Sequence, residues 1–225
     1  MDRRKFLNII SVSSLTLLLP IQNNAQLLFN NSKVFAEKYL LKILEIIKSL
    51  KANGSNIVLK IMDGKKYKFD PMVHYPFDGG IVDPKTNSRV FFHAHRKNEY
   101  GHFHTFVEDD NGNLIHLVLI SMNKKGEPIG LSTVNRWVTG DKYVNAEELK
   151  HHFGKFKINK YLFKEERVLE FIENLFKAYK KEIFTLFEKR DTWIKNYVNT
   201  YYNEPFEDRK FEVLSSIKID VFKTD

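Results

Sequence analysis

The chain contains no cysteine among its 225 residues. This absence excludes thiolate zinc sites, disulfide bonds, cysteine nucleophiles and a lipid anchor attached through cysteine. Imidazole and carboxylate groups are therefore the side chains that remain for binding a transition metal.

Several familiar enzyme motifs are also missing. The sequence has no glycine-rich phosphate loop, no His-Glu-x-x-His helix and no Gly-x-Ser-x-Gly turn. Internal repeats and long linkers are absent as well, and 43% of the residues are hydrophobic, which is enough to bury one core. We therefore expect one domain over residues 32–225, with a histidine-rich β region at 70–121.

The N-terminus has the organisation of an export signal. Arg3-Arg4-Lys5-Phe6-Leu7 precedes the apolar stretch from Ile9 to Leu19, which is too short to span a hydrocarbon core of about 30 Å. The paired arginines resemble the twin-arginine export signal. This predicts a signal and leader over residues 1–31, a periplasmic or other extracytoplasmic location, and no transmembrane span in the mature protein. An uncleaved anchor or a helix that is not exported is the alternative.

The net charge of +8 comes from lysines that are spread along the chain. Lys65-Lys66-x-Lys68 and the run from Lys150 to Lys164 could form a basic face for an anionic surface, with Tyr and Phe nearby. Such runs are more often solvated faces, and export would remove most access to nucleic acid. We therefore expect no nucleic-acid partner.

The hydrophobic pattern predicts an α+β fold. Val34 to Leu50 carries a wide helical stripe that stops at Asn53-Gly54, whereas 57–138 consists of short apolar runs separated by turn dipeptides. We expect a mainly antiparallel sheet over about 57–138, packed against this N-terminal helix and against C-terminal helices. Leu114 to Ile120 is apolar on both faces, which predicts a central strand covered by helices on one side.

The C-terminal third is predicted to be mostly helical. Asn145 is a predicted N-cap for a short helix through His152, and Glu165 to Tyr202 forms one long helix or two consecutive ones. Phe211 to Phe222 is predicted to be a closing strand or an extended tail.

Six of the eight histidines lie between residues 74 and 116. Four of them form two His-x-His triplets, His93-Ala-His95 and His102-Phe-His104, in β-branched and aromatic segments joined by a polar linker. Residues separated by one share a face of a strand, so each triplet presents both imidazoles together. A hairpin symmetric about its linker would pair His95 with His102 and His93 with His104, and would bring four rings to one metal ion.

The remaining histidines are weaker candidates. His74 and His116 are additional candidate ligands, whereas His151 and His152 are predicted to lie on a helix surface. The alternative for all of them is ordinary hydrogen bonding of strand histidines to backbone, serine or water.

A string of motifs extends the histidine region: Phe92-His-Ala-His-Arg96, Glu99-Tyr-Gly-His-Phe-His-Thr-Phe106 and Asn135-Arg-Trp-Val-Thr-Gly140. Together with His74-Tyr-Pro and His116-Leu-Val, this string resembles an uncharacterised bacterial family of unknown function over roughly residues 70–145. The resemblance groups these residues as a unit and assigns no reaction.

A weaker resemblance is to the cupins. His93, His95 and Glu99 are similar to the opening of their first metal motif, and a cupin site would imply iron or manganese. The sequence departs from that pattern later, with Phe106 in place of a glycine and Thr133 in place of the fourth ligand.

Three functions follow from these patterns. The chain is an exported histidine-rich protein that binds copper or zinc, a hydrolytic or oxygen-using metalloenzyme, or a structural or interaction domain without a metal. For the enzyme, Glu99 is a candidate general base, and Arg96 and Arg136 could hold an anionic substrate. An exposed turn is the ordinary place for Glu99, and a stack of Arg136 on Trp137 is an equally good interpretation.

Overall fold

The computed structural model describes residues 21–223, with side chains from Lys33 onward. The chain divides into two units, 1–34 and 35–225, and the account below concerns the second. The predicted twin-arginine motif and its apolar stretch lie outside the described residues. Within the described part of the chain, no helix combines the length and apolar character needed to cross a membrane.

The predicted N-terminal helix is confirmed, and it begins earlier than expected. Helix α1 spans Ile21–Ala52 and ends directly before Asn53-Gly54. Its core-facing residues recur at helical spacing, namely Ile43, Ile46, Ile47 and Leu50. The next segment corrects a prediction, because Ile57–Met62 forms the short helix α2 rather than a strand. The Asn56 side chain caps this helix by accepting a hydrogen bond from the Leu59 backbone amide at 2.9 Å.

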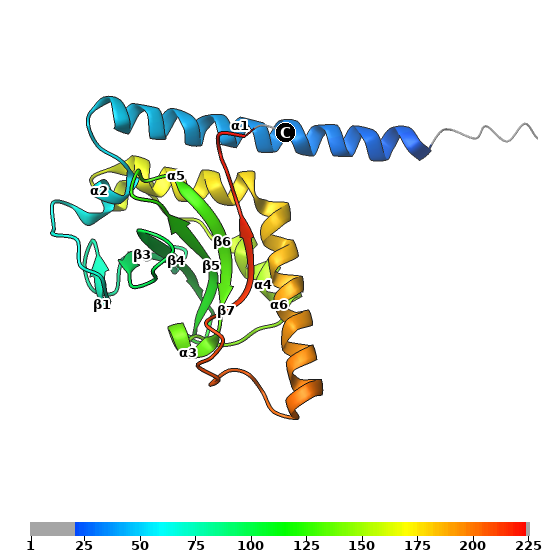
Figure 1. Cartoon of the computed structure of the whole chain (residues 1–225). Coiled ribbons are helices and arrows are strands. Elements are labelled where there is room, and N and C mark those ends of the chain that lie inside the picture. The colour runs from blue at the N-terminus through cyan, green and yellow to red at the C-terminus, as the bar shows by residue number, and fades with distance from the viewer. Residues whose placement is uncertain (1–20, 224–225) are drawn as a thin grey trace, which may run out of the picture. The chain divides into compact units, whose positions relative to one another are not determined.

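Within residues 21–223, seven strands form one antiparallel sheet, which confirms the predicted fold class. Their order is β1-β3-β4-β5-β6-β7, with β2 paired to β3. The strands are β1 (Asp70–Tyr75), β2 (Ile81–Asp83), β3 (Ser88–Ala94), β4 (Gly101–Glu108), β5 (Leu114–Met122), β6 (Pro128–Val134) and β7 (Val213–Lys218). The closing strand β7 returns after the helices to pair with β6, as Figure 1 shows.

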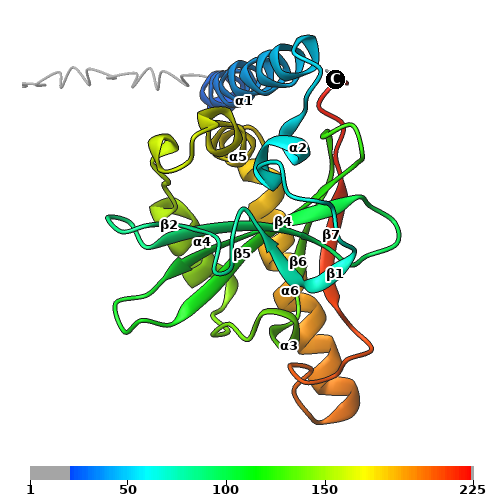
Figure 2. The ribbon, with the colours of Figure 1, turned by 90° about the vertical axis from the view of Figure 1, so that its left-hand side faces the viewer.

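The helices that follow β6 are α3 (Arg136–Thr139), α4 (Ala146–Lys155), α5 (Glu166–Ala178) and α6 (Lys180–Tyr201), with a 3₁₀ turn at Lys160–Leu162. The segment 165–202 therefore forms two consecutive helices. Helices α4 and α6 lie on one side of the sheet (Figure 1), and the view from the other side shows the strands in front of them (Figure 2). Strand β5 is buried along nearly its whole length, as expected for a central strand.

The two faces of the sheet differ in chemistry. The helix-covered face is apolar and includes Val90, Phe92, Phe103, Ile120 and Leu131. Neighbouring residues alternate faces. The opposite face therefore carries Phe91 and His93 of β3, His102, His104 and Phe106 of β4, and Leu119 and Ser121 of β5. The histidines thus lie on the face that the long helices leave uncovered.

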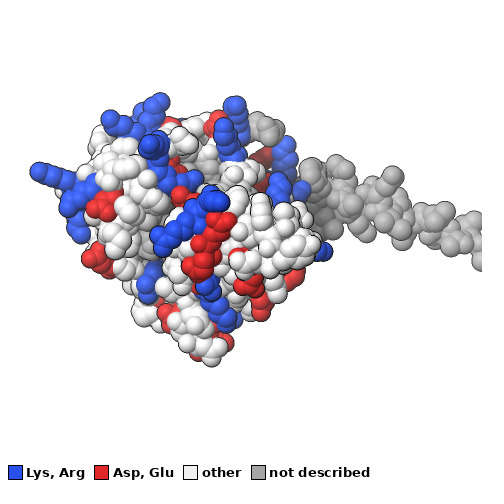
Figure 3. Space-filling view, turned by 60° about the horizontal axis from the view of Figure 1, so that its bottom comes forward, with Lys and Arg blue, Asp and Glu red and all other residues white. Residues whose placement is uncertain are grey.

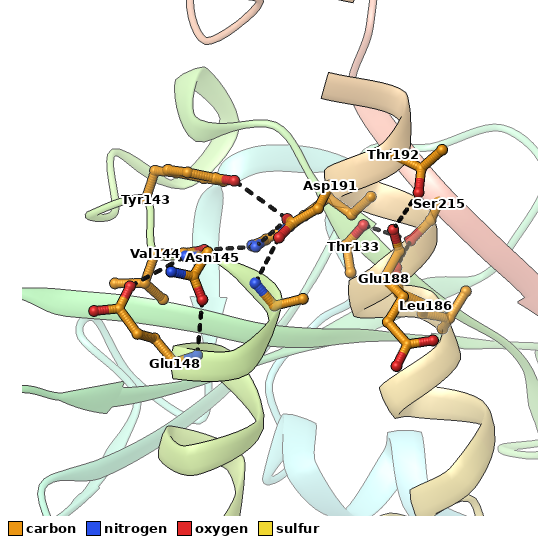
Figure 4. A network of polar contacts seen from close by, with 12 residues as sticks. Thr133, Tyr143, Val144, Asn145, Glu148, Leu186, Glu188, Asp191, Thr192 and Ser215 are labelled. Atoms are coloured by element: carbon orange, nitrogen blue, oxygen red, sulfur yellow. Dashed lines mark hydrogen bonds and ion pairs between the residues drawn. The ribbon is translucent and has the colours of Figure 1, made fainter. Parts of the chain in front are cut away.

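Polar contacts fix α6 to the start of α4 and to the sheet. Asn145 and Glu148 form a reciprocal capping box at the start of α4, which confirms Asn145 as the N-cap. Asp191 of α6 accepts hydrogen bonds from the Tyr143 hydroxyl at 3.2 Å and from the Ala146 amide at 2.6 Å (Figure 4). Ser215 of β7 donates to the Leu186 carbonyl at 2.8 Å, which joins α6 to the sheet edge.

The charged residues do not form a block of one sign on the face shown in Figure 3. Lysine and arginine side chains lie next to aspartate and glutamate side chains there. Arg136 and Glu207 form an exposed ion pair, 2.6 Å apart. Surface pairs of this kind contribute little to stability, at most about 1 kcal/mol each.

Candidate metal centre

The centre of the histidine region is the hairpin of β3 and β4. These strands pair His93 directly with His102 and Phe91 with His104. The symmetric register, with His95 opposite His102, is therefore wrong by two residues. A shift of two keeps every side chain on its predicted face, because the side-chain period of a strand is two. His95 lies just beyond the end of β3, in the linker 95–100.

Glycine at position 101 allows this linker to turn into β4. A Cβ atom built on Gly101 would lie 2.3 Å from the Phe92 ring and 2.8 Å from the His93 carbonyl oxygen. The close approach of the two strands next to His93 and His102 therefore requires a residue without a side chain.

Three histidines converge on one point. Each of His93, His95 and His102 offers a ring nitrogen, and these atoms all lie within 4.8 Å of one another. His93 and His102 are buried and His95 is half-buried. The Nε2 atoms of His93 and His102 are 2.7 Å apart. A triad of imidazoles with this spacing could hold a metal ion.

The opposite side of each buried imidazole is held by a hydrogen-bond acceptor. His93 Nδ1 lies 3.1 Å from the Pro71 carbonyl oxygen. His102 Nδ1 forms a hydrogen bond with the Glu99 carboxylate. Metal-binding histidines usually have such a partner, because it fixes the ring orientation and the tautomer.

The position of Glu99 corrects the expectation of an exposed turn residue. Its side chain is only 4% exposed, and it lies 3.7 Å from Arg96 in an ion pair. Burial raises the pKa of the Glu99 carboxyl, and Ser121 and Arg96 oppose that rise. Arg96 also contacts Glu212 at 3.3 Å, which ties the linker to the segment before β7.

The imidazoles of the triad favour the neutral form. Burial lowers the pKa of His93 to about 3, with a further contribution from His102. Burial also lowers the pKa of His95, and that of His102 lies well below its ordinary value. Neutral imidazole is the form that binds a metal ion, so the triad needs no proton loss near pH 7.

His104 and His116 form a separate buried pair. His104 Nδ1 and His116 Nε2 are 2.9 Å apart, and both residues are at most 5% exposed. The ring centroid of His104 is 4.8 Å from that of His102, so the pair adjoins the triad. His104, predicted as a fourth ligand, is thus engaged with His116 in this structure.

A β-bulge places His116 on the histidine face. The pairing of β4 with β5 shifts by one residue between His104 and Phe106, so Thr105 faces both Leu117 and Val118. The Thr105 hydroxyl donates to the Val118 carbonyl at 2.7 Å and accepts from the Val118 amide at 3.1 Å. Regular pairing would have turned His116 toward the helices.

The remaining candidates lie at different distances from the triad. The ring of His74 is 5.3 Å from that of His93 and 4.4 Å from that of Phe91, next to the triad. Arg136 lies on α3, where it pairs with Glu207 and stacks on Phe206 rather than on Trp137. His151 and His152 lie on α4, as predicted.

A polar cleft opens beside the half-buried His95. It has a volume of about 300 Å³ and is lined by His95, Arg96, Lys97, Asn98, Glu99 and Glu212. Of the three arginine and glutamate candidates, Arg96 and Glu99 line this cleft. Pro71 and Glu212 were not anticipated as part of the site. Neither residue belongs to a local motif. Glu212 lies beside the site because β7, which begins at the next residue, pairs back into the sheet.

A family model, Domain of unknown function (DUF6969), matches residues 37–219. The chain belongs to the DUF6969 family. The matched range contains the triad, the His104 and His116 pair and the polar cleft, so the whole candidate site lies within the DUF6969 domain. No curated protein and no solved structure matches the chain.

The architecture limits the likeness to cupins. Cupins are built as two stacked sheets, whereas the described strands of this DUF6969 domain form one sheet. Glu99, which corresponds to the carboxylate of the cupin motif, bonds to the far side of His102. Its carboxylate therefore orients a histidine of the triad in this structure.

Proposed function

We propose that this protein binds one divalent transition metal ion, zinc or copper, through His93, His95 and His102. The observation that carries the proposal is the orientation of His93 and His102. The Pro71 carbonyl can only accept a hydrogen bond, and an ionised Glu99 also only accepts. With Glu99 ionised, both Nδ1 atoms carry the hydrogen, and both Nε2 atoms present lone pairs to each other at 2.7 Å.

A cation between these lone pairs converts a repulsive contact into two bonds. Nitrogen atoms bound to one tetrahedral zinc ion at about 2.0 to 2.1 Å lie about 3.3 Å apart. The two rings would therefore have to separate by about 0.6 Å. The third ligand, His95, lies in the linker rather than in the ladder, so it can adjust to the ion.

The test is a calorimetric titration of zinc and of copper into chelator-treated protein. We expect one site per chain, and we expect His95→Ala to weaken binding by more than the ten- to hundredfold that the loss of a supporting group causes. His95 is half-buried, so this variant should fold. His151→Ala, at an exposed position on α4, is the matched control and should bind as the wild type does. Equal binding by His95→Ala and the wild type would refute the assignment.

We also propose that residues 1–31 direct export by the twin-arginine route to the periplasm or another extracytoplasmic compartment. The paired arginines and the short apolar stretch behind them support this proposal. Replacing Arg3 and Arg4 together by lysine should retain the protein inside the cell, whereas Lys5→Arg should not. Cell fractionation with detection of the full chain distinguishes the two outcomes.

The cleft beside His95 favours a metal-dependent hydrolase as the second candidate. Three protein ligands leave a fourth zinc position for water, and zinc lowers the pKa of bound water to about 7. Arg96 and Lys97 would attract an anionic substrate to this cleft. The test is zinc-dependent hydrolysis of small anionic esters. A rate that falls in Arg96→Gln but not in Arg136→Gln would establish the hydrolase function. If the metal-loaded protein showed no such activity, metal binding without hydrolysis would be the remaining function.

A further inference from the structure

Two adjoining clefts lie beside the helices, and no histidine of the triad lines either of them. The larger has a volume of about 540 Å³ and an aromatic floor of Phe153, Phe156 and Phe176. The rings of Phe153 and Phe176 are stacked with centroids 4.8 Å apart, and Phe156 meets Phe176 at 4.7 Å. Its rim carries Lys155, Lys157, Lys177 and Lys180.

The smaller cleft continues the larger one and is polar. Its volume is about 360 Å³, and it shares Lys157, Glu173 and Lys177 with its neighbour. Lys38, Lys42 and Lys160 also line it, together with Asn159 and Asn174. The joined clefts therefore have an apolar half and a lysine-rich half.

The acidic residues of the clefts do not balance these lysines. Glu173 pairs with Lys177 at 3.2 Å, and Glu170 pairs with Lys160 at 3.4 Å. Within residues 33–223, no ion pair joins Lys38, Lys42, Lys155 or Lys157 to a carboxylate. The run from Lys150 to Lys164 thus contributes part of a basic rim around an aromatic floor.

We propose that the joined clefts bind one anionic amphiphile, a long-chain carboxylate. The apolar tail lies on the phenylalanine floor, where removal from water stabilises the complex by about 25 cal/mol for each Å² of apolar surface. The carboxylate contacts the lysines of the polar half through charge-assisted hydrogen bonds. The volumes fall within the range of about 300 to 1,000 Å³ that is common for small-molecule sites.

A substitution at Gly154 can block the apolar half of the joined clefts. It lies on α4 and lines the larger cleft, and a Cβ atom built on it has no heavy atom within 4 Å. Because Gly154 lines the cleft, we expect a leucine side chain here to occupy part of it, and leucine favours the helix over glycine by several tenths of a kcal/mol. Loss of binding in Gly154→Leu would therefore not result from unfolding.

The test is calorimetric titration of the full chain with dodecanoate below its micelle concentration, with a chelator present to keep metal off the histidines. We expect one site per chain, no comparable binding of dodecyltrimethylammonium, and wild-type affinity in Gly154→Ala. Gly154→Leu should abolish binding. Lys157→Glu should weaken it about tenfold or more, the change expected from losing a charge-assisted contact. Lys189→Glu, at an exposed position on α6, should leave the affinity unchanged.

Three results would overturn the proposal. Equal affinity for the anionic and the cationic amphiphile would show that the lysines do not select the ligand. Unchanged dodecanoate binding in Gly154→Leu, or no binding at all by the wild type, would show that the clefts are not the site. None of these outcomes depends on the histidine triad, so they test this inference separately from the metal proposal.

Discussion

His93 and His102 face each other across neighbouring strands with their Nε2 atoms 2.7 Å apart, and the other ring nitrogen of each is already bonded to an acceptor. Both partners lie outside the strand pair. Pro71 belongs to β1, and Glu99 belongs to the linker between β3 and β4. The sheet edge and the linker therefore orient the two imidazoles together, before any ion is bound.

Glu99 should act as a supporting residue for the metal. Replacing it by glutamine removes the charge that holds the Nδ1 hydrogen of His102 but keeps the size of the side chain. We expect zinc affinity to fall about 10- to 100-fold with the fold intact. Competition against a fluorescent zinc chelator measures this change. Glu204→Gln, at an exposed position, is the control, and an unaltered affinity in Glu99→Gln would contradict the role.

His116 should make metal-free protein less stable in acid. Burial lowers its pKa to about 3 in the folded state. Between pH 6.5 and 3 the unfolded chain therefore binds a proton that the folded chain excludes, and the free energy of unfolding falls as the pH falls. At pH 5 the loss is about 2 kcal/mol for this histidine.

The variant His116→Gln isolates that contribution, because other buried groups titrate in the same range. Urea unfolding of both proteins at pH 5 and pH 7.5 gives the difference. The wild type should lose more stability than the variant between these pH values. Equal losses would mean that His116 becomes protonated in the folded protein.

Thr105 should hold the bulge that places His116. Thr105→Val keeps the shape of the side chain and removes the hydroxyl that pairs with the buried Val118 amide and carbonyl. We expect the free energy of unfolding to fall by about 1 to 3 kcal/mol. Thr200→Val, at an exposed position on α6, should change it by less than about 0.5 kcal/mol. Similar values for the two variants, measured by urea unfolding, would show that the hydroxyl does not stabilise the bulge.

Much of the fold follows from local patterns in the sequence. The long α1 stripe, the Asn145 cap and the apolar segment Leu114 to Ile120 each predict the element that forms. The segment at Ile57 is the exception. Its apolar run predicts a strand, although Asn56 directly before it is a helix N-cap.

The candidate site was predicted in part, for a physical reason. Alternation along a strand fixes which histidines share a face. The predicted grouping of His93, His95 and His102 is therefore correct, although the predicted register is wrong by two residues. The register itself depends on the path of the linker, where Glu99 turns inward to His102. The bulge at Thr105 depends on pairing with β5, which no local spacing shows. His116 therefore could not be placed from the sequence.

The most direct test of the central claim is the metal content of the untagged protein purified from its native compartment, measured by elemental mass spectrometry beside a His93→Ala, His102→Ala variant. The account predicts close to one zinc or copper ion per wild-type chain and almost none in the variant, while His151→Ala keeps its metal. Wild-type protein that carries no metal and takes up neither zinc nor copper at micromolar concentrations would contradict it.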